Sequence, residues 1–298
     1  MFEGVAVAMV TPFRDGEIDF EALDRLVDHL LDGGIDGIVP VGCTGEAAVL
    51  SPSERLQVIQ RVQKRTRGRA YILPGTGTNT TASTIERTRE ARELGVDGAM
   101  LITPYYNKPT PAGLLAHYQT VADAVDIPIV LYNVPGRTGV SLTVPTVIRL
   151  AKHPRIVAIK EASGSLEAIS EIAHAGTITL LSGDDGLTLP ILAVGGQGVV
   201  SVLGNLFPRA MVSMVKAARS NDLETARRYH LALGPLFKAL FIESNPGPIK
   251  YLLSQEGLIK DEFRLPLVPI REDNREGLRE VAERVRRAIE GLDQEVRS

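Results

Sequence analysis

Short apolar segments alternate with amphipathic segments along the first two thirds of the chain, and this repeat restricts the fold more than any other feature. Eight apolar segments recur: Val5–Thr11, Gly37–Gly42, Ala70–Gly75, Gly98–Pro104, Ile127–Val134, Ile156–Lys160, Ile178–Ser182 and Gly198–Leu203. Strands that alternate with helices pair in parallel through right-handed crossovers. Eight such units predict an α/β protein folded as a (β/α)8 barrel of the TIM type. A doubly wound open sheet is the alternative.

Helix signals fill the intervals between the apolar segments. Between Phe20 and Leu31, apolar residues recur at helical spacing, and two glycines end the run. Ser51 to Glu54 forms a capping box with proline at the first helical position. Thr110-Pro111 and Thr143 to Pro145 indicate two further helix starts.

After Leu203 the pattern becomes helical alone. Four helices are predicted, at about Arg209–Ser220, Leu223–Phe241, Ile249–Gly257 and Arg275–Leu292. Glycine-, serine- or proline-rich linkers do not separate them from the barrel. We therefore predict a catalytic barrel over residues 1–222 and a C-terminal helical region, 223–298, packed against it.

Composition excludes several classes of protein. The 298 residues carry a formal net charge of −3 without a basic block, which argues against nucleic-acid binding. Long apolar runs typical of a membrane span are absent from the sequence. Met1–Pro12 lacks the basic region of a signal peptide, and the single cysteine, Cys43, fits a reducing cytoplasm. The five histidines form no metal-spaced pair, so we expect no metal site.

Lys160 ends a strand that reads as buried on both faces. Desolvation disfavours its charged form, so a buried lysine has a lowered pKa and its neutral amine can attack a carbonyl. The alternative is a lysine that extends into solvent at the strand end.

Active sites of such barrels lie at the carboxyl ends of the strands. The residues there supply one amine, several phenols, small hydroxyls and glycine-flanked backbone amides, and we expect no cofactor. This inventory suits Schiff-base chemistry, with a lysine as nucleophile and a tyrosine that moves protons. Gly75-Thr76-Gly77 lacks the rest of a nucleotide-binding fingerprint and is interpreted as a barrel loop. Asp184-Asp185 is interpreted as a helix start rather than a metal site.

Seven motifs in register resemble the 4-hydroxy-tetrahydrodipicolinate synthase (dihydrodipicolinate synthase) family of pyruvate-dependent lyases, which includes N-acetylneuraminate lyase. They are VPVGCTGEAAVL, ITPYYNKP, LYNVPGRTGV, VAIKEASG, LLSGDD, NPGPIK and RLPLVP, and they extend over nearly the whole chain. The resemblance implies a barrel, condensation of pyruvate with L-aspartate 4-semialdehyde in lysine biosynthesis, and a homotetramer of tight dimers.

The resemblance also implies roles for individual residues. Lys160 would form an imine with pyruvate, and Tyr132 would be the general acid and base beside it. Tyr106 would extend across the dimer interface into the neighbouring site to relay protons, whereas Tyr105 is the better candidate for interface packing.

The remaining implied positions bind substrate. Thr44 would bind the pyruvate carboxylate through its hydroxyl and backbone amide, and Arg137 would hold the carboxylate of the second substrate with its planar fork. Gly183 and Val200 are further implied substrate-binding positions.

Cys43 departs from the family pattern, which has threonine there. That threonine hydroxyl connects the two tyrosines matched by Tyr132 and Tyr106, and a thiol is a weaker donor and acceptor. Cys43 can still relay protons, a water can substitute, or the residue only packs.

Two other functions stay open from the residues. One is a pyruvate-dependent aldolase of a sugar acid or 4-hydroxy-2-oxoglutarate, and Arg137 with the Tyr105-Tyr106 pair argues against it. The other is a catalytically silent barrel, which retention of Lys160 and Tyr132 argues against. Ser83, Pro52 and Arg55 occupy positions that bind L-lysine in lysine-sensitive members of the family, so we expect weak or absent inhibition by lysine.

Overall fold

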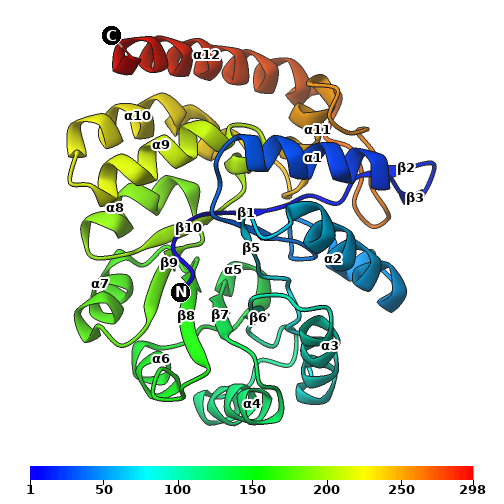
Figure 1. The fold of residues 1–298 in the computed structure, drawn as a ribbon, viewed down its shortest axis with the longest axis vertical. Helices are drawn as coiled ribbons and strands as arrows, with labels where there is room; N and C mark the ends of the chain where they lie inside the picture. The colour runs from blue at the N-terminus through cyan, green and yellow to red at the C-terminus, as the bar shows by residue number, and fades with distance from the viewer. Residues whose placement is uncertain (298) are drawn as a thin grey trace.

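In the computed structural model, which describes residues 1–297, eight parallel strands surround a central axis and helices cover their outside (Figure 1). The strands are β1 (Gly4–Ala8), β4 (Gly37–Val39), β5 (Tyr71–Ile72), β6 (Ala99–Ile102), β7 (Ile129–Asn133), β8 (Ile156–Glu161), β9 (Thr179–Ser182) and β10 (Gly198–Ser201). Each predicted apolar segment overlaps one of these strands, so the prediction of a (β/α)8 barrel is confirmed and the open sheet is wrong.

The barrel closes between β5 and β6. These strands end the hydrogen-bonded order β5-β4-β1-β10-β9-β8-β7-β6, and they meet through the isolated parallel bridge between Gly75 and Met100. The Met100 amide donates to the Pro74 carbonyl at 2.9 Å, and the Thr76 amide donates to the Met100 carbonyl at 3.0 Å. A Cβ at Gly75 would lie 2.7 Å from the Val41 carbonyl oxygen, so only glycine fits here.

The barrel helices follow the predicted pattern. They are α1 (Phe20–Asp32), α2 (Pro52–Thr66), α3 (Thr81–Glu93), α4 (Pro111–Ala124), α6 (Val144–Leu150), α7 (Leu166–Ala175), α8 (Thr188–Ala193) and α9 (Pro208–Arg219). The predicted capping box at Ser51 is present, with Ser51 and Glu54 exchanging hydrogen bonds. The sequence did not predict the antiparallel hairpin of β2 (Phe13–Arg14) and β3 (Glu17–Ile18), or the short helix α5 (Pro135–Thr138).

The C-terminal region consists of α10 (Leu223–Ala239), α11 (Gly247–Gln255) and α12 (Glu272–Arg297). Helix α10 packs against α9 of the barrel, and α12 packs on α10 and α11 (Figure 1). This is the helical region expected over 223–298, whose final residue, Ser298, lies outside the described residues. Its division from the barrel at residue 222 stays a prediction.

Two apolar cores share the strands because successive side chains of a strand point to opposite faces. Ala6, Ala8, Val130, Ala158 and Val200 face the barrel interior, whereas Val5 and Val7 pack with the helices outside. This alternation decides which polar residues at the strand ends face inward.

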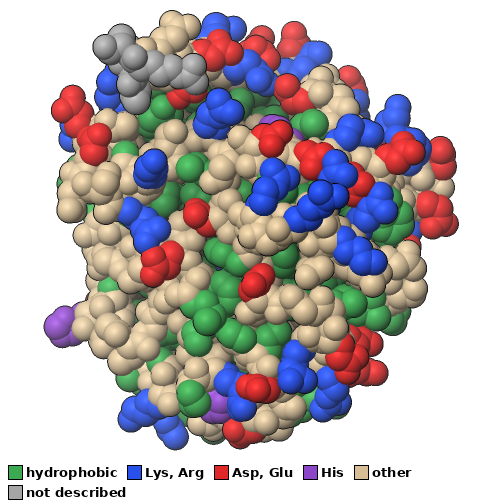
Figure 2. Space-filling model, viewed as in Figure 1, with side chains coloured by type: hydrophobic (Ala, Val, Ile, Leu, Met, Phe, Trp, Pro, Cys, Tyr) green, Lys and Arg blue, Asp and Glu red, His purple; other side chains and the backbone are tan. Residues whose placement is uncertain are grey.

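The surface carries charges of both signs (Figure 2). Over α1 and α2 they form ion pairs between the two helices: Arg61 Nε donates to Asp24 at 2.8 Å, and Arg65 pairs with Asp28. The described helices include none that is long and apolar enough to cross a membrane.

Candidate active site

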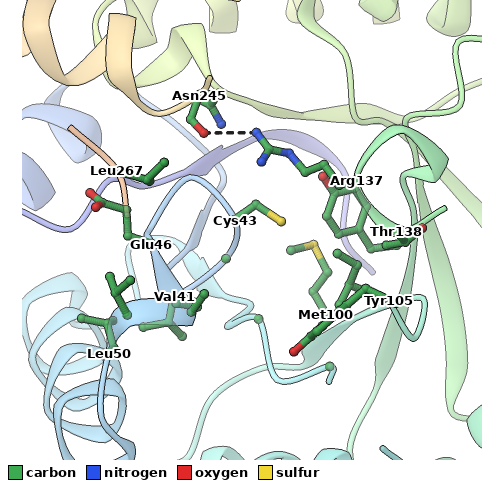
Figure 3. A pocket seen from close by; sticks show the side chains of 18 of the residues that line it. Val41, Cys43, Glu46, Leu50, Met100, Tyr105, Arg137, Thr138, Asn245 and Leu267 are labelled. Carbon is green, nitrogen blue, oxygen red and sulfur yellow. Dashed lines mark hydrogen bonds between the residues drawn. The ribbon is translucent and has the colours of Figure 1, made fainter. Parts of the chain in front are cut away.

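A cavity of about 500 Å³ opens at the carboxyl ends of the strands. Figure 3 shows Cys43, Met100, Tyr105 and Arg137 around it. Its wall combines apolar side chains with a few polar groups, which is typical of small-molecule sites. The described residues contain no group of three or more metal-ligating side chains.

Lys160 faces the barrel interior. It lies two residues after Ala158, whose side chain belongs to the interior core, so strand alternation places both on the same face. Lys160 is 5% exposed, and burial lowers its pKa to about 8. The nearby Cys43 side chain and the negative charge of Asp185 oppose this shift. About a tenth of the amine is therefore neutral at pH 7, far more than for an ordinary lysine. The interpretation of Lys160 as a solvated strand end is wrong.

Tyr132 lies beside Lys160. The two residues are register partners on β7 and β8, and Nζ of Lys160 lies 4.1 Å from the centre of the Tyr132 ring. Burial is the main cause that raises the pKa of Tyr132, and the neighbouring Cys43 side chain adds to the shift. The phenol is thus held protonated, ready to donate, between the amine and the thiol.

Thr44 lies in the loop after β4, where it is 3% exposed. Its Oγ1 accepts a hydrogen bond from Nδ2 of Asn245 at 2.9 Å. Thr44 does not itself line the cavity, whereas its neighbour Cys43 and Asn245 do. The sequence analysis included the NPGPIK motif but missed that Asn245 contacts the site, because the contact spans 201 positions of sequence.

Arg137 projects into the cavity from α5, not from an irregular loop. Its NH2 donates to the backbone carbonyl of Asn245 at 3.1 Å, the contact drawn in Figure 3. The other nitrogens of the Arg137 guanidinium group can donate to a ligand. The positive charge of Arg137 also contributes, after burial, to the lowered pKa of Lys160. This placement fits a carboxylate-binding role.

The two tyrosines of the Tyr-Tyr motif differ in position. Tyr105 lines the cavity, although sequence favoured it for interface packing. Tyr106 is 89% exposed, with a left-handed φ of 74°. Its side chain lies outside the cavity of its own chain.

Gly183 lies directly after the carboxyl end of β9, and Val200 lies within β10. A Cβ at Gly183 would lie 3.1 Å from Cε of Lys160 and 2.7 Å from Cβ of Ala162, so glycine leaves room for the lysine chain. Val200 packs in the interior core with Tyr132.

Asp184 and Asp185 have different roles. Asp184 caps a short 3-10 helix (Asp185–Leu187) by accepting from the Gly186 amide at 2.8 Å, which confirms the predicted helix start. Asp185 is buried and accepts from the amides of Val202 and Leu203 at 3.0 and 2.8 Å. Its negative charge acts on Lys160, a relationship that the sequence analysis missed.

Comparison with known proteins is consistent with this geometry. The sequence profile of the Dihydrodipicolinate synthetase family matches residues 1–285. The 4-hydroxy-tetrahydrodipicolinate synthase of Pelobacter propionicus is 49% identical over 277 residues, which cover 92% of this chain and 96% of the relative.

Solved structures agree. The 4-hydroxy-tetrahydrodipicolinate synthase from Methylacidiphilum fumariolicum SolV superposes with a TM-score of 0.97 at 43% identity, covering 99% of each chain. A chloride-inhibited dihydrodipicolinate synthase from Acinetobacter baumannii, complexed with pyruvate, gives a TM-score of 0.94 at 42% identity, covering 96% of this chain and 99% of that one. Together with the buried lysine and its tyrosine partner, these matches show that the chain belongs to the dihydrodipicolinate synthetase family.

Proposed function

We propose that the protein condenses pyruvate with L-aspartate 4-semialdehyde to 4-hydroxy-tetrahydrodipicolinate, in the diaminopimelate route of lysine biosynthesis, with Lys160 as the Schiff-base nucleophile. The observation that carries the proposal is the inward-facing amine of Lys160, whose pKa burial lowers to about 8, beside the Tyr132 ring. The relatives with this activity, and the pyruvate complex of one of them, support it.

The chemistry follows from a neutral amine. Lys160 adds to the keto carbon of pyruvate, water leaves, and the protonated imine draws electrons so that the methyl group loses a proton to give an enamine. The enamine carbon attacks the aldehyde carbon, and Tyr132 supplies the proton to the aldehyde oxygen. The amino group of the second substrate then displaces Lys160 from the imine carbon, which closes the ring and frees the enzyme.

Other residues bind and orient the substrates. Thr44, held by Asn245, binds the pyruvate carboxylate with its backbone amide, and Arg137 binds the carboxylate of the aldehyde. Gly183 and Val200 shape the space around the imine, and Cys43 relays protons from Tyr132.

Tyr106 enters the site of a second copy in a homotetramer of tight dimers. Its 89% exposure supports a contact outside its own chain. Light scattering of the purified protein tests the assembly, for which the mass of four chains is expected. The single cysteine supports a cytoplasmic location.

Borohydride trapping tests the mechanism. Reduction in the presence of pyruvate should fix a three-carbon adduct on the peptide that contains Lys160, and Lys160→Ala should abolish it. The other buried lysine, Lys250, is a built-in control and should stay unmodified. Parallel assays with L-aspartate 4-semialdehyde and with sugar-acid aldehydes identify the second substrate. An adduct on another lysine, or no adduct, would contradict the proposal.

A further inference from the structure

A second buried lysine, Lys250 on α11, is held in place by an ion pair and a hydrogen bond, so it is not available as a nucleophile. Its Nζ donates to Oε1 of Glu46 at 2.6 Å and to the Thr11 carbonyl at 3.1 Å. The rings of Phe13 and Phe263 lie 4.6 and 4.4 Å from the same nitrogen. Both side chains of the ion pair are 0% exposed. The ammonium group is enclosed by acceptors and aromatic faces, which favour a cation.

Glu46 ends the loop that carries Cys43 and Thr44. Its backbone is left-handed, with φ of 54°, a conformation that glutamate rarely adopts without other constraints. The Glu46 amide donates to the Cys43 carbonyl at 3.1 Å, so the position of Glu46 and the turn at Cys43 depend on each other. The hydroxyl of Thr11, three residues after the end of β1, donates to the Gly45 carbonyl at 2.7 Å and holds the same loop.

Glu46 also lines the cavity, and Figure 3 shows it beside Leu267 on the wall. Its second oxygen, Oε2, is buried without a hydrogen-bond partner in the part of the chain that the structure describes. Burial raises the pKa of Glu46, and Lys250 opposes that shift. Without Lys250, the carboxylate would lose its main compensation for burial and would turn toward the cavity or become protonated.

The C-terminal region therefore contacts the loop Gly42–Glu46 at two residues. Asn245 donates to Thr44, and Lys250 binds Glu46 and the Thr11 carbonyl. Asn245 also accepts from Arg137, so the same segment joins both carboxylate-binding positions of the proposed function.

We propose that Glu46 and Lys250 are positioning residues that hold the loop Gly42–Glu46 in the conformation that binds the pyruvate carboxylate. This inference rests on the proposed function and extends it to a fully buried ion pair outside the residues assigned to the imine and the aldehyde. Lys250 acts from the C-terminal helical region, so that region is part of the pyruvate site and not only a cover for the barrel.

The test separates positioning from stability. Lys250→Met and Glu46→Gln should each raise the KM for pyruvate at least about tenfold per folded enzyme, with a smaller change in the KM for the aldehyde. Glu46→Gln keeps the size of the side chain and serves if Lys250→Met folds poorly. The double variant removes both charges and should recover part of the affinity lost in Lys250→Met, because no unpaired buried charge remains.

Tyr229→Phe is the matched control. It removes the 2.5 Å hydrogen bond between Tyr229 and Asp293, which joins α10 to α12 away from the cavity. It should lower the Tm and leave both KM values unchanged. An unchanged KM for pyruvate in both single variants, beside a wild type that traps pyruvate on Lys160, would overturn the positioning inference alone. A wild type that traps no pyruvate would overturn the proposed function and this inference together.

Discussion

Tyr132 and Lys160 are register partners on adjacent strands, and Nζ of Lys160 lies 4.1 Å from the centre of the Tyr132 ring. Their separation is set by strand pairing, since neighbouring strands lie about 4.8 Å apart. A closed barrel thus fixes the proton donor beside the amine without help from a mobile loop.

Tyr132→Phe should slow turnover by about 10² to 10⁴, the usual contribution of general acid–base catalysis. The ring remains, so the packing beside Lys160 is kept and pyruvate should still be trapped by borohydride. Steady-state rates and trapping on the same preparation check this. A variant with wild-type turnover would show that another group moves the proton.

The Cys43 series separates proton relay from packing. If the thiol beside Tyr132 relays protons, Cys43→Ser should keep activity that Cys43→Ala loses, and Cys43→Thr should be equal to or faster than wild type. Turnover rates of the three variants decide the matter. Equal rates for alanine and serine would show that the residue only packs.

The rate of imine formation should follow the pKa of Lys160, which burial lowers to about 8. The neutral amine is the reactive form and its fraction grows with pH, so the initial trapping rate should rise about tenfold per pH unit and flatten above about pH 8. Trapping rates measured at several pH values test this. A rate that still rises above about pH 9.5 would indicate an unshifted lysine.

Lys160→Met should stabilise the fold at pH 7. The pKa of Lys160 is about 8 when folded and near its ordinary value when unfolded. The unfolded chain therefore binds more protons than the folded chain between about pH 8 and 10.5, so the stability of the wild type rises with pH through that window. Below it, the wild type is destabilised by the full free energy of burying the protonated Lys160. At pH 7 we expect Lys160→Met to raise the free energy of unfolding by ~1–3 kcal/mol over the wild type, and this difference should vanish near pH 11. Thermal unfolding at both pH values checks the sign, and a less stable variant at pH 7 would contradict it.

L-Lysine should inhibit weakly or not at all. Arg55 is 6% exposed, and its Nε meets no hydrogen-bond acceptor within residues 1–297. Burial lowers the pKa of Arg55, and the positive charge of Arg87, on the cavity wall, lowers it further. The ammonium group of a bound L-lysine would meet the positive charges of Arg55 and Arg87 here, while Glu86 and Glu90 also act on Arg55. Rates measured across added L-lysine test this, and half-inhibition at or below about 1 mM, roughly 4 kcal/mol of binding, would contradict it.

The architecture could be predicted because the eight barrel strands and most of the helices carry local signals, which the β2–β3 hairpin and the short helix α5 lack. The ends of the strands could not: Val5–Thr11 was predicted, but β1 stops at Ala8. The residues after Ala8 stay buried: the Met9 amide still donates to the Val39 carbonyl of β4, whereas the Val10 amide donates to Oδ1 of Asn205. Composition alone does not distinguish these two partners.

The site was predictable only where strand or motif placed a residue. Lys160 and Tyr132 follow from strand ends and matched motifs, whereas Asn245 and Lys250 reach the loop after β4 from more than 200 positions away. Such contacts depend on how the C-terminal region packs against the barrel. The hydrophobic periodicity of the sequence predicts helices there but not where they pack.

The glycines at the closure of the barrel limit how the specificity of this enzyme can change. Gly75 and Gly77 both line the cavity, and a Cβ on Gly77 would lie 2.5 Å from the Ile102 amide nitrogen. That wall is bare backbone and cannot accept a side chain without reopening the contact between β5 and β6. Laboratory evolution toward other aldehydes should therefore collect its substitutions at other lining positions, such as Ala47, Ala48 and Leu267, and leave the two glycines unchanged.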